Sequence, residues 1–206
     1  CVNANNRKVV VNELQKDETG YYTMDLEDLE SKITSKTKIL ALCSPHNPVG
    51  RVWSKEELEK LANICIKHNI IIVSDEIHSD ITFKKFTPLA SISKEIANQT
   101  ITLNSAGKTF NIAGLNSAYA ISKNQKILDK FKKIAQKREI QSINFFGYIA
   151  TKAAYDNGAI FVDELKKYLL SNMEFTKNYF ERKNIKIDFF QPEATYLLWL
   201  DFSKFN

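Results

Sequence analysis

The apolar residues of this 206-residue chain fall into short, unbroken runs separated by polar stretches. Three runs have the length of a strand, at residues 38–43, 70–73 and 100–103. An unbroken apolar run, unlike an alternating one, is typical of a strand that is covered on both faces. The pattern therefore predicts three buried strands.

A helix is predicted between the first two strands. Ser54 and Glu57 have the spacing of a capping box, and the apolar positions after them recur on one helical face. These positions are Leu58, Leu61, Ala62 and Cys65. A strand, a helix and a second strand imply parallel pairing with a right-handed crossover, and functional side chains in such sheets gather beyond the carboxyl ends of the strands.

The rest of the chain predicts further elements around this sheet. We expect a strand at 117–122, helices at about 124–137 and 142–156, and a long helix from about 159 to 182. Strand-like stretches follow at 185–190 and 196–201. The expected fold class is α/β: a three-layer sandwich with a mainly parallel sheet over residues 1–157, then a linking helix and the start of a small α+β domain over 158–206.

Composition favours a globular chain, because 44% of the residues are hydrophobic and no apolar run reaches 18 residues. We expect no membrane partner. Three cysteines without a metal-type pair predict a reducing, cytoplasmic compartment. The net charge of +5 is densest at residues 130–138, where apolar residues at helical spacing predict a solvated helix face. The apolar residues are Leu128, Phe131, Ile134 and Ala135. No nucleic-acid-binding motif accompanies this charge, so no nucleic-acid partner is expected.

Polar loops follow all three predicted strands, at 44–50, 75–80 and 104–111. Asn47 is held between two prolines, Asp75 ends a buried strand where a carboxylate needs a cation or a donor, and Lys108 lies in a tight segment of small residues. A lysine that is partly desolvated can attack an aldehyde. Each residue also has an ordinary interpretation, as a turn asparagine, a helix cap or salt bridge, and a surface lysine. Glu76 is expected to face outward.

A metal site is an alternative for the second loop. His78 and Asp80 form an H-x-D arrangement, which could bind iron together with a second histidine. His68 is expected on the opposite side of the strand–helix–strand unit, so His46 is the remaining partner. We do not favour this alternative.

Together, the three loops closely resemble the motifs of fold-type I pyridoxal-phosphate enzymes, the class I/II aminotransferase superfamily. The motifs occur in the same order and spacing, and the resemblance also covers residues 153–158 and 192–201. It implies pyridoxal 5'-phosphate as the cofactor, an amino acid as the substrate and a homodimeric enzyme.

The resemblance also implies roles for individual residues. Lys108 would hold the cofactor as a Schiff base and carry the α-proton of the substrate. Asp75 would pair with the ring nitrogen, Asn47 would donate to the phenolic oxygen, and Ser105 would bind the phosphate. His78, where most aminotransferases of this superfamily have tyrosine, would also lie at the cofactor.

Two departures separate the branches of the family. The D-E-I-H pattern ending at His78 is similar to the cystathionine β-lyase branch, and Asn116 stands where many aminotransferases have a phosphate-binding arginine. We therefore expect a C–S β-lyase that cleaves S-substituted cysteines to a thiol, pyruvate and ammonia, with an aminotransferase as the alternative. A non-catalytic descendant is a third alternative, disfavoured because Lys108, Asp75 and Asn47 are all present.

The family's chain normally begins before the position of Cys1 and continues past that of Asn206. By this resemblance, the residues that stack on the cofactor ring, complete the phosphate site and bind the substrate carboxylate should lie outside these 206 residues. The chain is therefore expected to be an internal fragment that binds the cofactor weakly or is inactive.

Overall fold

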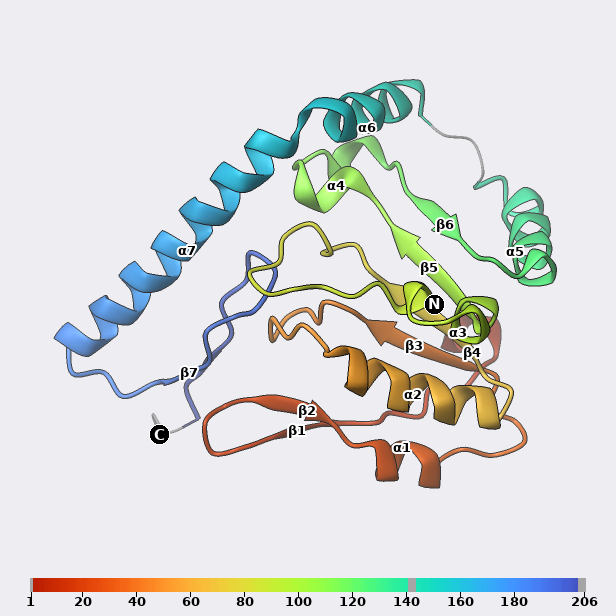
Figure 1. The fold of residues 1–206 in the computed structure, drawn as a ribbon, viewed down its shortest axis with the longest axis horizontal. Coiled ribbons are helices and arrows are strands. Elements are labelled where there is room, and N and C mark those ends of the chain that lie inside the picture. The colour runs from red at the N-terminus through yellow and green to blue at the C-terminus, as the bar shows by residue number, and fades with distance from the viewer. Residues whose placement is uncertain (1, 141–143, 204–206) are drawn as a thin grey trace.

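A four-stranded sheet forms the centre of the protein in a computed structural model that describes residues 2–140 and 144–203 (Figure 1). The first three strands are parallel, as predicted, and the fourth is antiparallel. In the register of the parallel strands, Cys43 lies opposite Asp75, and Asp75 lies opposite Leu103. The loops that follow these strands therefore leave the sheet at one edge. In spatial order, the strands are β3 (Ile39–Cys43), β4 (Ile71–Asp75), β5 (Thr100–Asn104) and β6 (Tyr119–Ile121).

The predicted crossover helix is α2 (Lys55–Lys67), and it begins with the predicted capping box. The Ser54 hydroxyl accepts from the backbone N–H of Glu57, and the Glu57 carboxylate accepts from the backbone N–H of Ser54. The predicted apolar face of α2 is buried against the sheet in one core with Trp53. Its four residues are Leu58, Leu61, Ala62 and Cys65, none of which is more than 2% exposed.

Smaller elements complete the first 115 residues of the chain. A hairpin and a short helix precede the sheet and lie beside α2 in Figure 1. Leu29 and residues of this hairpin pack on the same core. The smaller elements are η1 (Asn3–Asn5), β1 (Leu14–Lys16), β2 (Tyr22–Met24), α1 (Leu26–Ser31), η2 (Leu89–Ser91), α3 (Lys94–Gln99), α4 (Ala106–Thr109) and η3 (Ala113–Leu115). No helix or strand was expected in these segments, and α4 lies within the stretch 104–111 that was expected to be a loop.

The second half of the chain has the predicted helices and strands, with shorter strands than expected. Figure 1 shows α6 beside α4 and α7 extending from it along one side of the molecule, towards β7. The expected start of one helix at residue 142 lies outside the described residues. These elements are α5 (Gln125–Lys137), α6 (Phe145–Asn157), α7 (Ala159–Arg182), β7 (Asp188–Phe189) and β8 (Leu200–Asp201), the last two antiparallel.

The apolar face expected on α5 is largely open. Ala135 is buried, but Phe131 and Ile134 are 44% and 57% exposed. The spacing of apolar residues predicted this helix correctly, because the helical period of apolar positions can be read from the sequence alone. Burial depends on a neighbouring element, and the residues of 2–140 and 144–203 leave Phe131 and Ile134 uncovered.

No helix among the described residues is long and apolar enough to cross a membrane.

Candidate active site

The three motif loops meet at the carboxyl edge of the sheet through direct side-chain contacts. The amide nitrogen of Asn47, in the first loop, lies 3.2 Å from Nε2 of His78 in the second. Because an amide nitrogen only donates, Nε2 accepts, and the ring proton of His78 is on Nδ1. The second loop is joined to the third by two further hydrogen bonds. Asn104 Nδ2 donates to Ser79 Oγ (3.0 Å), and Thr109 Oγ1 donates to Asp80 Oδ2 (2.9 Å).

His78 is the most enclosed of the predicted site residues, at 2% exposed. Its Nδ1 has no hydrogen-bond partner among the described residues. Burial lowers the pKa of His78, the positive charge of Lys108 lowers it further, and the negative charge of Asp75 acts in the opposite direction. Lys108 and Asp75 are thus both close enough to act on the imidazole, which is neutral at physiological pH.

Asp75 and Glu76 take orientations opposite to those expected. Side chains alternate along β4, so Asp75 is exposed at the strand end, whereas Glu76 points to the buried side together with Ser74. Glu76 is 3% exposed and accepts from Ser74 Oγ (2.9 Å) and the Leu89 backbone N–H (3.2 Å). Burial raises its pKa, despite these bonds. The prediction that Glu76 faces outward was therefore wrong.

Lys108 and Ser105 are placed by the short helix α4. Ser105 caps this helix by accepting from the Gly107 N–H (2.9 Å), and its hydroxyl donates to the Ser117 carbonyl oxygen (2.6 Å). Lys108 is half-buried in α4. A hydroxyl has one proton to donate, so Ser105 can bind a phosphate oxygen only if that proton leaves Ser117.

The backbone conformation at position 116 explains why an asparagine is found there. It ends η3 with φ at +50°, a left-handed conformation that asparagine adopts more readily than most residues. The side chain is exposed, with a long hydrogen bond (3.4 Å) from its amide nitrogen to the Gly114 carbonyl.

The described residues do not support the metal alternative. No group of three or more histidine, cysteine, aspartate or glutamate side chains in residues 2–140 and 144–203 could hold an ion. Asp80 accepts from Thr109, and the ring of His46 packs edge-on against Trp53. His68 is the C-cap residue of α2, just before the start of β4 and 2.8 Å from Glu30, and so lies away from the strand ends as expected.

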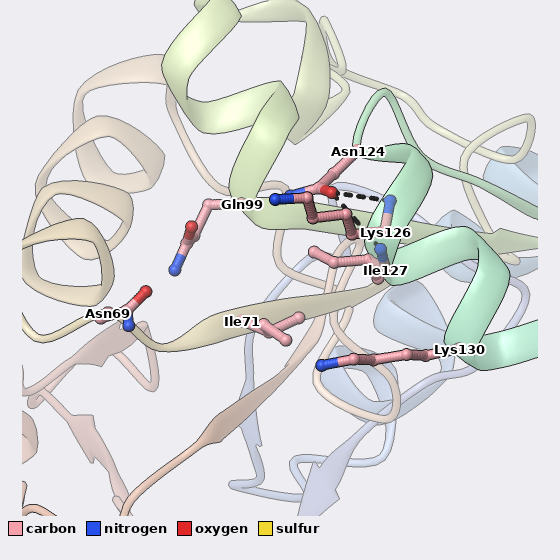
Figure 2. A pocket seen from close by; sticks show the side chains of 7 residues that line it. All are labelled: Asn69, Ile71, Gln99, Asn124, Lys126, Ile127 and Lys130. Carbon is pink, nitrogen blue, oxygen red and sulfur yellow. Dashed lines mark hydrogen bonds between the residues drawn. The ribbon is translucent and has the colours of Figure 1, made fainter.

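A cavity of about 260 Å³ lies away from these loops (Figure 2). It reaches Ile71, the first residue of β4, whereas Asp75 is the last, so it belongs to the opposite edge of the sheet. Figure 2 shows the Asn124 side chain accepting hydrogen bonds at the start of α5, with Lys126 and Lys130 along that helix. The cavity contains none of the predicted site residues.

Sequence reasoning missed four residues beside the site: Arg51, Lys84, Glu193 and Tyr196. The ring of Tyr196 packs edge-on against His78, with centroids 5.5 Å apart. Arg51 directly follows the motif glycine and is 1% exposed, paired with Glu193, which is 4% exposed. A charged residue with apolar neighbours on both sides, here Val49 and Val52, is a signal for a buried ion pair, but the partner of Arg51 lies 142 positions away.

Comparison with known proteins agrees with this geometry. The family model "Aminotransferase class I and II" matches residues 1–205. The chain belongs to this family. One solved structure similar to the chain is that of cystalysin of Treponema denticola, which contains pyridoxal 5'-phosphate. That structure has a TM-score of 0.91 at 35% identity over 99% of this chain and 52% of its own.

Other proteins similar to the chain carry names that correspond to the two expected activities. Cystathionine beta-lyase PatB of Bacillus subtilis (strain 168) is 40% identical over 100% of this chain and 54% of its own length. A pyridoxal-phosphate-bound "putative aminotransferase" of Clostridium difficile 630 matches 98% of this chain and 52% of its own, with a TM-score of 0.94 at 48% identity. The chain thus spans about half the length of these relatives, and the pyridoxal-phosphate-dependent transferase fold predicted from sequence is confirmed.

Proposed function

We propose that the protein containing these residues is a pyridoxal-phosphate-dependent C–S β-lyase, which cleaves S-substituted cysteines to a thiol, pyruvate and ammonia. The observation that carries this proposal is the contact between Asn47 and His78 beside Lys108 and Asp75. PatB, which is similar over the whole chain, is named as a cystathionine β-lyase, and this supports the same activity.

The donor set of the site fits pyridoxal phosphate. The cofactor, when bound, supplies an electron sink for the carbanion formed at the substrate Cα. Asp75 is exposed at the strand end, where its carboxylate can hold a protonated ring nitrogen. Asn47 would donate from its amide to a phenolic oxygen, and Ser105 would donate to a phosphate oxygen once its proton leaves the Ser117 carbonyl.

Lys108 has the central role in this proposal. Its amine can take the proton from the substrate Cα, because it is half-buried at the same edge of the sheet as Asp75. The β-thiolate then leaves from Cβ. His78 is neutral and holds the Asn47 amide in place, so it adds no charge at the phenolic oxygen.

An aminotransferase is the second candidate, and the similarity to the "putative aminotransferase" of Clostridium difficile 630 favours it. Transamination uses the same lysine, aspartate and asparagine but needs a keto acid as acceptor. For either activity we propose a homodimer that works in the cytoplasm on a small amino-acid substrate.

The test uses the whole protein with and without Lys108→Ala. The unaltered protein should develop a visible absorbance band with pyridoxal phosphate and release pyruvate from cystathionine without any keto acid. Lys108→Ala should lose both, whereas Lys94→Ala, which changes an exposed lysine of α3, should retain both. Pyruvate release by Lys108→Ala would overturn the proposal, and a strict need for a keto acid would favour the aminotransferase.

A further inference from the structure

A segment that follows α7 lies directly against the first two motif loops. Figure 1 shows the last part of the chain returning from the end of α7 to the loops at the carboxyl edge of the sheet. Four backbone hydrogen bonds fix this segment, residues 193–195, to residues 50 and 81–83. They run from Glu193 N (2.8 Å) and Ala194 N (3.0 Å) to Gly50 O, from Phe83 N to Glu193 O (2.8 Å), and from Thr195 N to Ile81 O (2.8 Å).

A buried ion pair joins the same segment to the first loop. The Arg51 guanidinium donates from NH1 to Glu193 Oε2 at 2.7 Å, and the Val52 backbone N–H donates to the same oxygen at 2.9 Å. Lys84 is paired with the other oxygen of Glu193. Glu57 accepts from NH2 of Arg51 at 2.7 Å. Because two charges lose their hydration here, this contact is tolerated only in a geometry that pairs them fully.

Two backbone conformations show that the approach is close. Gly50 has φ at +73°, and a Cβ there would lie 2.7 Å from Cβ of Pro192. Thr195, a β-branched residue that is fully buried, has φ at +71°. Such a conformation is unfavourable for a β-branched residue and persists only where surrounding contacts impose it. The contacts of residues 193–195 therefore hold a strained turn immediately before Tyr196.

The turn directs the Tyr196 ring onto the active site. Its ring meets the ring of His78 at 73°, with centroids 5.5 Å apart, and His78 in turn contacts Asn47. Tyr196 itself is 39% exposed, so backbone contacts and the ion pair, rather than deep burial of its own ring, determine its position.

We propose that the Arg51–Glu193 ion pair is a positioning device for the active site, which holds Tyr196 on His78 and thereby holds the Asn47 amide toward the cofactor. This inference rests on the proposed function for its last step. Arg51 and Glu193 are positioning residues, and neither contacts Asn47 or His78 itself through any hydrogen bond of the described residues.

The chain offers a matched pair of variants for the test. Glu193→Gln and Glu57→Gln each remove one carboxylate from Arg51, but only the first loosens the segment that carries Tyr196. A glutamine at position 57 also preserves the capping box of α2. Tyr196→Leu removes the ring and leaves the ion pair in place.

The experiment uses the whole protein and two readouts. The first is the pKa of the His78 ring in the cofactor-free protein, measured by NMR. Asp75 and Lys108 are the charged groups that act on this ring. In Glu193→Gln and in Tyr196→Leu, water should reach His78 and its pKa should rise toward the ordinary value. The second readout is kcat with cystathionine, expected to fall about tenfold or more in both, since small misplacements at a site are costly. Glu57→Gln should change neither readout beyond about twofold in kcat.

Each outcome decides the inference. Equal effects of Glu193→Gln and Glu57→Gln would overturn it, because the ion pair would then only compensate the charge of Arg51. An unchanged His78 pKa in Tyr196→Leu would overturn it even if Glu193→Gln failed to fold. Failure of the proposed function is recognised separately, since the unaltered protein would then release no pyruvate from cystathionine without a keto acid, while the His78 readout remained measurable.

Discussion

Nδ2 of Asn47 lies 3.2 Å from Nε2 of His78, and this hydrogen bond joins loops that follow two different strands. In β3 and β4, the strand-end residues Cys43 and Asp75 are directly opposite each other in the parallel register. The contact is thus a consequence of sheet geometry, and it gives a first prediction.

His78→Phe should retain the shape of the buried ring and lose the acceptor for Asn47. We expect kcat to fall roughly five- to tenfold, the equivalent of about one hydrogen bond, with a smaller change in KM. Steady-state kinetics of the whole protein with cystathionine would measure this. An unchanged kcat would contradict a positioning role for His78.

The pKa of His78 also makes stability depend on pH. Burial keeps this pKa below 6.5, so between the folded pKa and about 6.5 the unfolded chain binds more protons than the folded one. The free energy of unfolding should therefore rise with pH across this window, and the rise should be smaller in His78→Phe. Urea unfolding of both proteins at a series of pH values would test the sign; a steeper rise in the variant would contradict it.

Glu76 should behave in the opposite way. Burial raises its pKa above 4.5, so the folded state retains a proton that the unfolded state loses, and stability falls as the pH rises through this region. Glu76→Gln keeps an oxygen that can accept from Ser74 and Leu89, and it should be at least as stable as the unaltered protein at pH 7. Glu76→Ala should lose about 1–3 kcal/mol, because it leaves buried donors unpaired.

The low pKa of Glu193 should make the folded protein less stable in acid. Burial by itself would raise its pKa, but hydrogen bonds from Lys84, Val52 and Arg51 outweigh that effect and hold the pKa below 4.5. Its contribution to stability is complete above about pH 4.5 and is lost as the pH falls through the lower, folded-state pKa. Lys84→Met should reduce this acid-sensitive part, as measured by thermal unfolding between pH 3 and 6. A larger acid-sensitive part in the variant would be the contrary result.

Gly50→Ala tests the close approach of residues 192–194. Alanine there meets both an unfavourable positive φ and the 2.7 Å contact with Pro192, and we expect a loss of about 2–5 kcal/mol. Gly20→Ala is the matched control. Gly20 also has a positive φ, at +82°, but its nearest contact is an ordinary 3.8 Å, so it should lose only the backbone part. Equal losses in a denaturant titration would show that crowding at Gly50 is absent.

Much of the fold and part of the site could be predicted from sequence because both depend on local patterns. The unbroken apolar runs gave the three parallel strands, and their shared edge placed Asn47, Asp75 and Lys108 together. The proposed roles of these residues at the cofactor, and the boundary between the two expected domains, stay predictions.

Features that depend on distant partners could not be predicted. Which of Asp75 and Glu76 is buried depends on which face of β4 each side chain occupies. A shift of the strand by one residue would exchange the two faces, and the sequence pattern does not fix this. Arg51 and Glu193 are far apart in the chain, and an ion pair has no period that a sequence pattern could reveal. The short hairpin of β1 and β2 was not predicted because its strands have three residues each, too few to show an apolar pattern.

The placement of Glu193 has a consequence for any shortened version of this protein. Cutting the chain after Arg182 at the end of α7 removes a short stretch that looks peripheral, yet it takes away a counter-charge of Arg51. The guanidinium, 1% exposed between the rings of Tyr21 and Trp53, would remain beside the Asn47 loop with Glu57 as its one carboxylate partner among the residues described. Residues 183–203 should therefore be kept in any shortened version, since without them Arg51 loses a buried counter-charge.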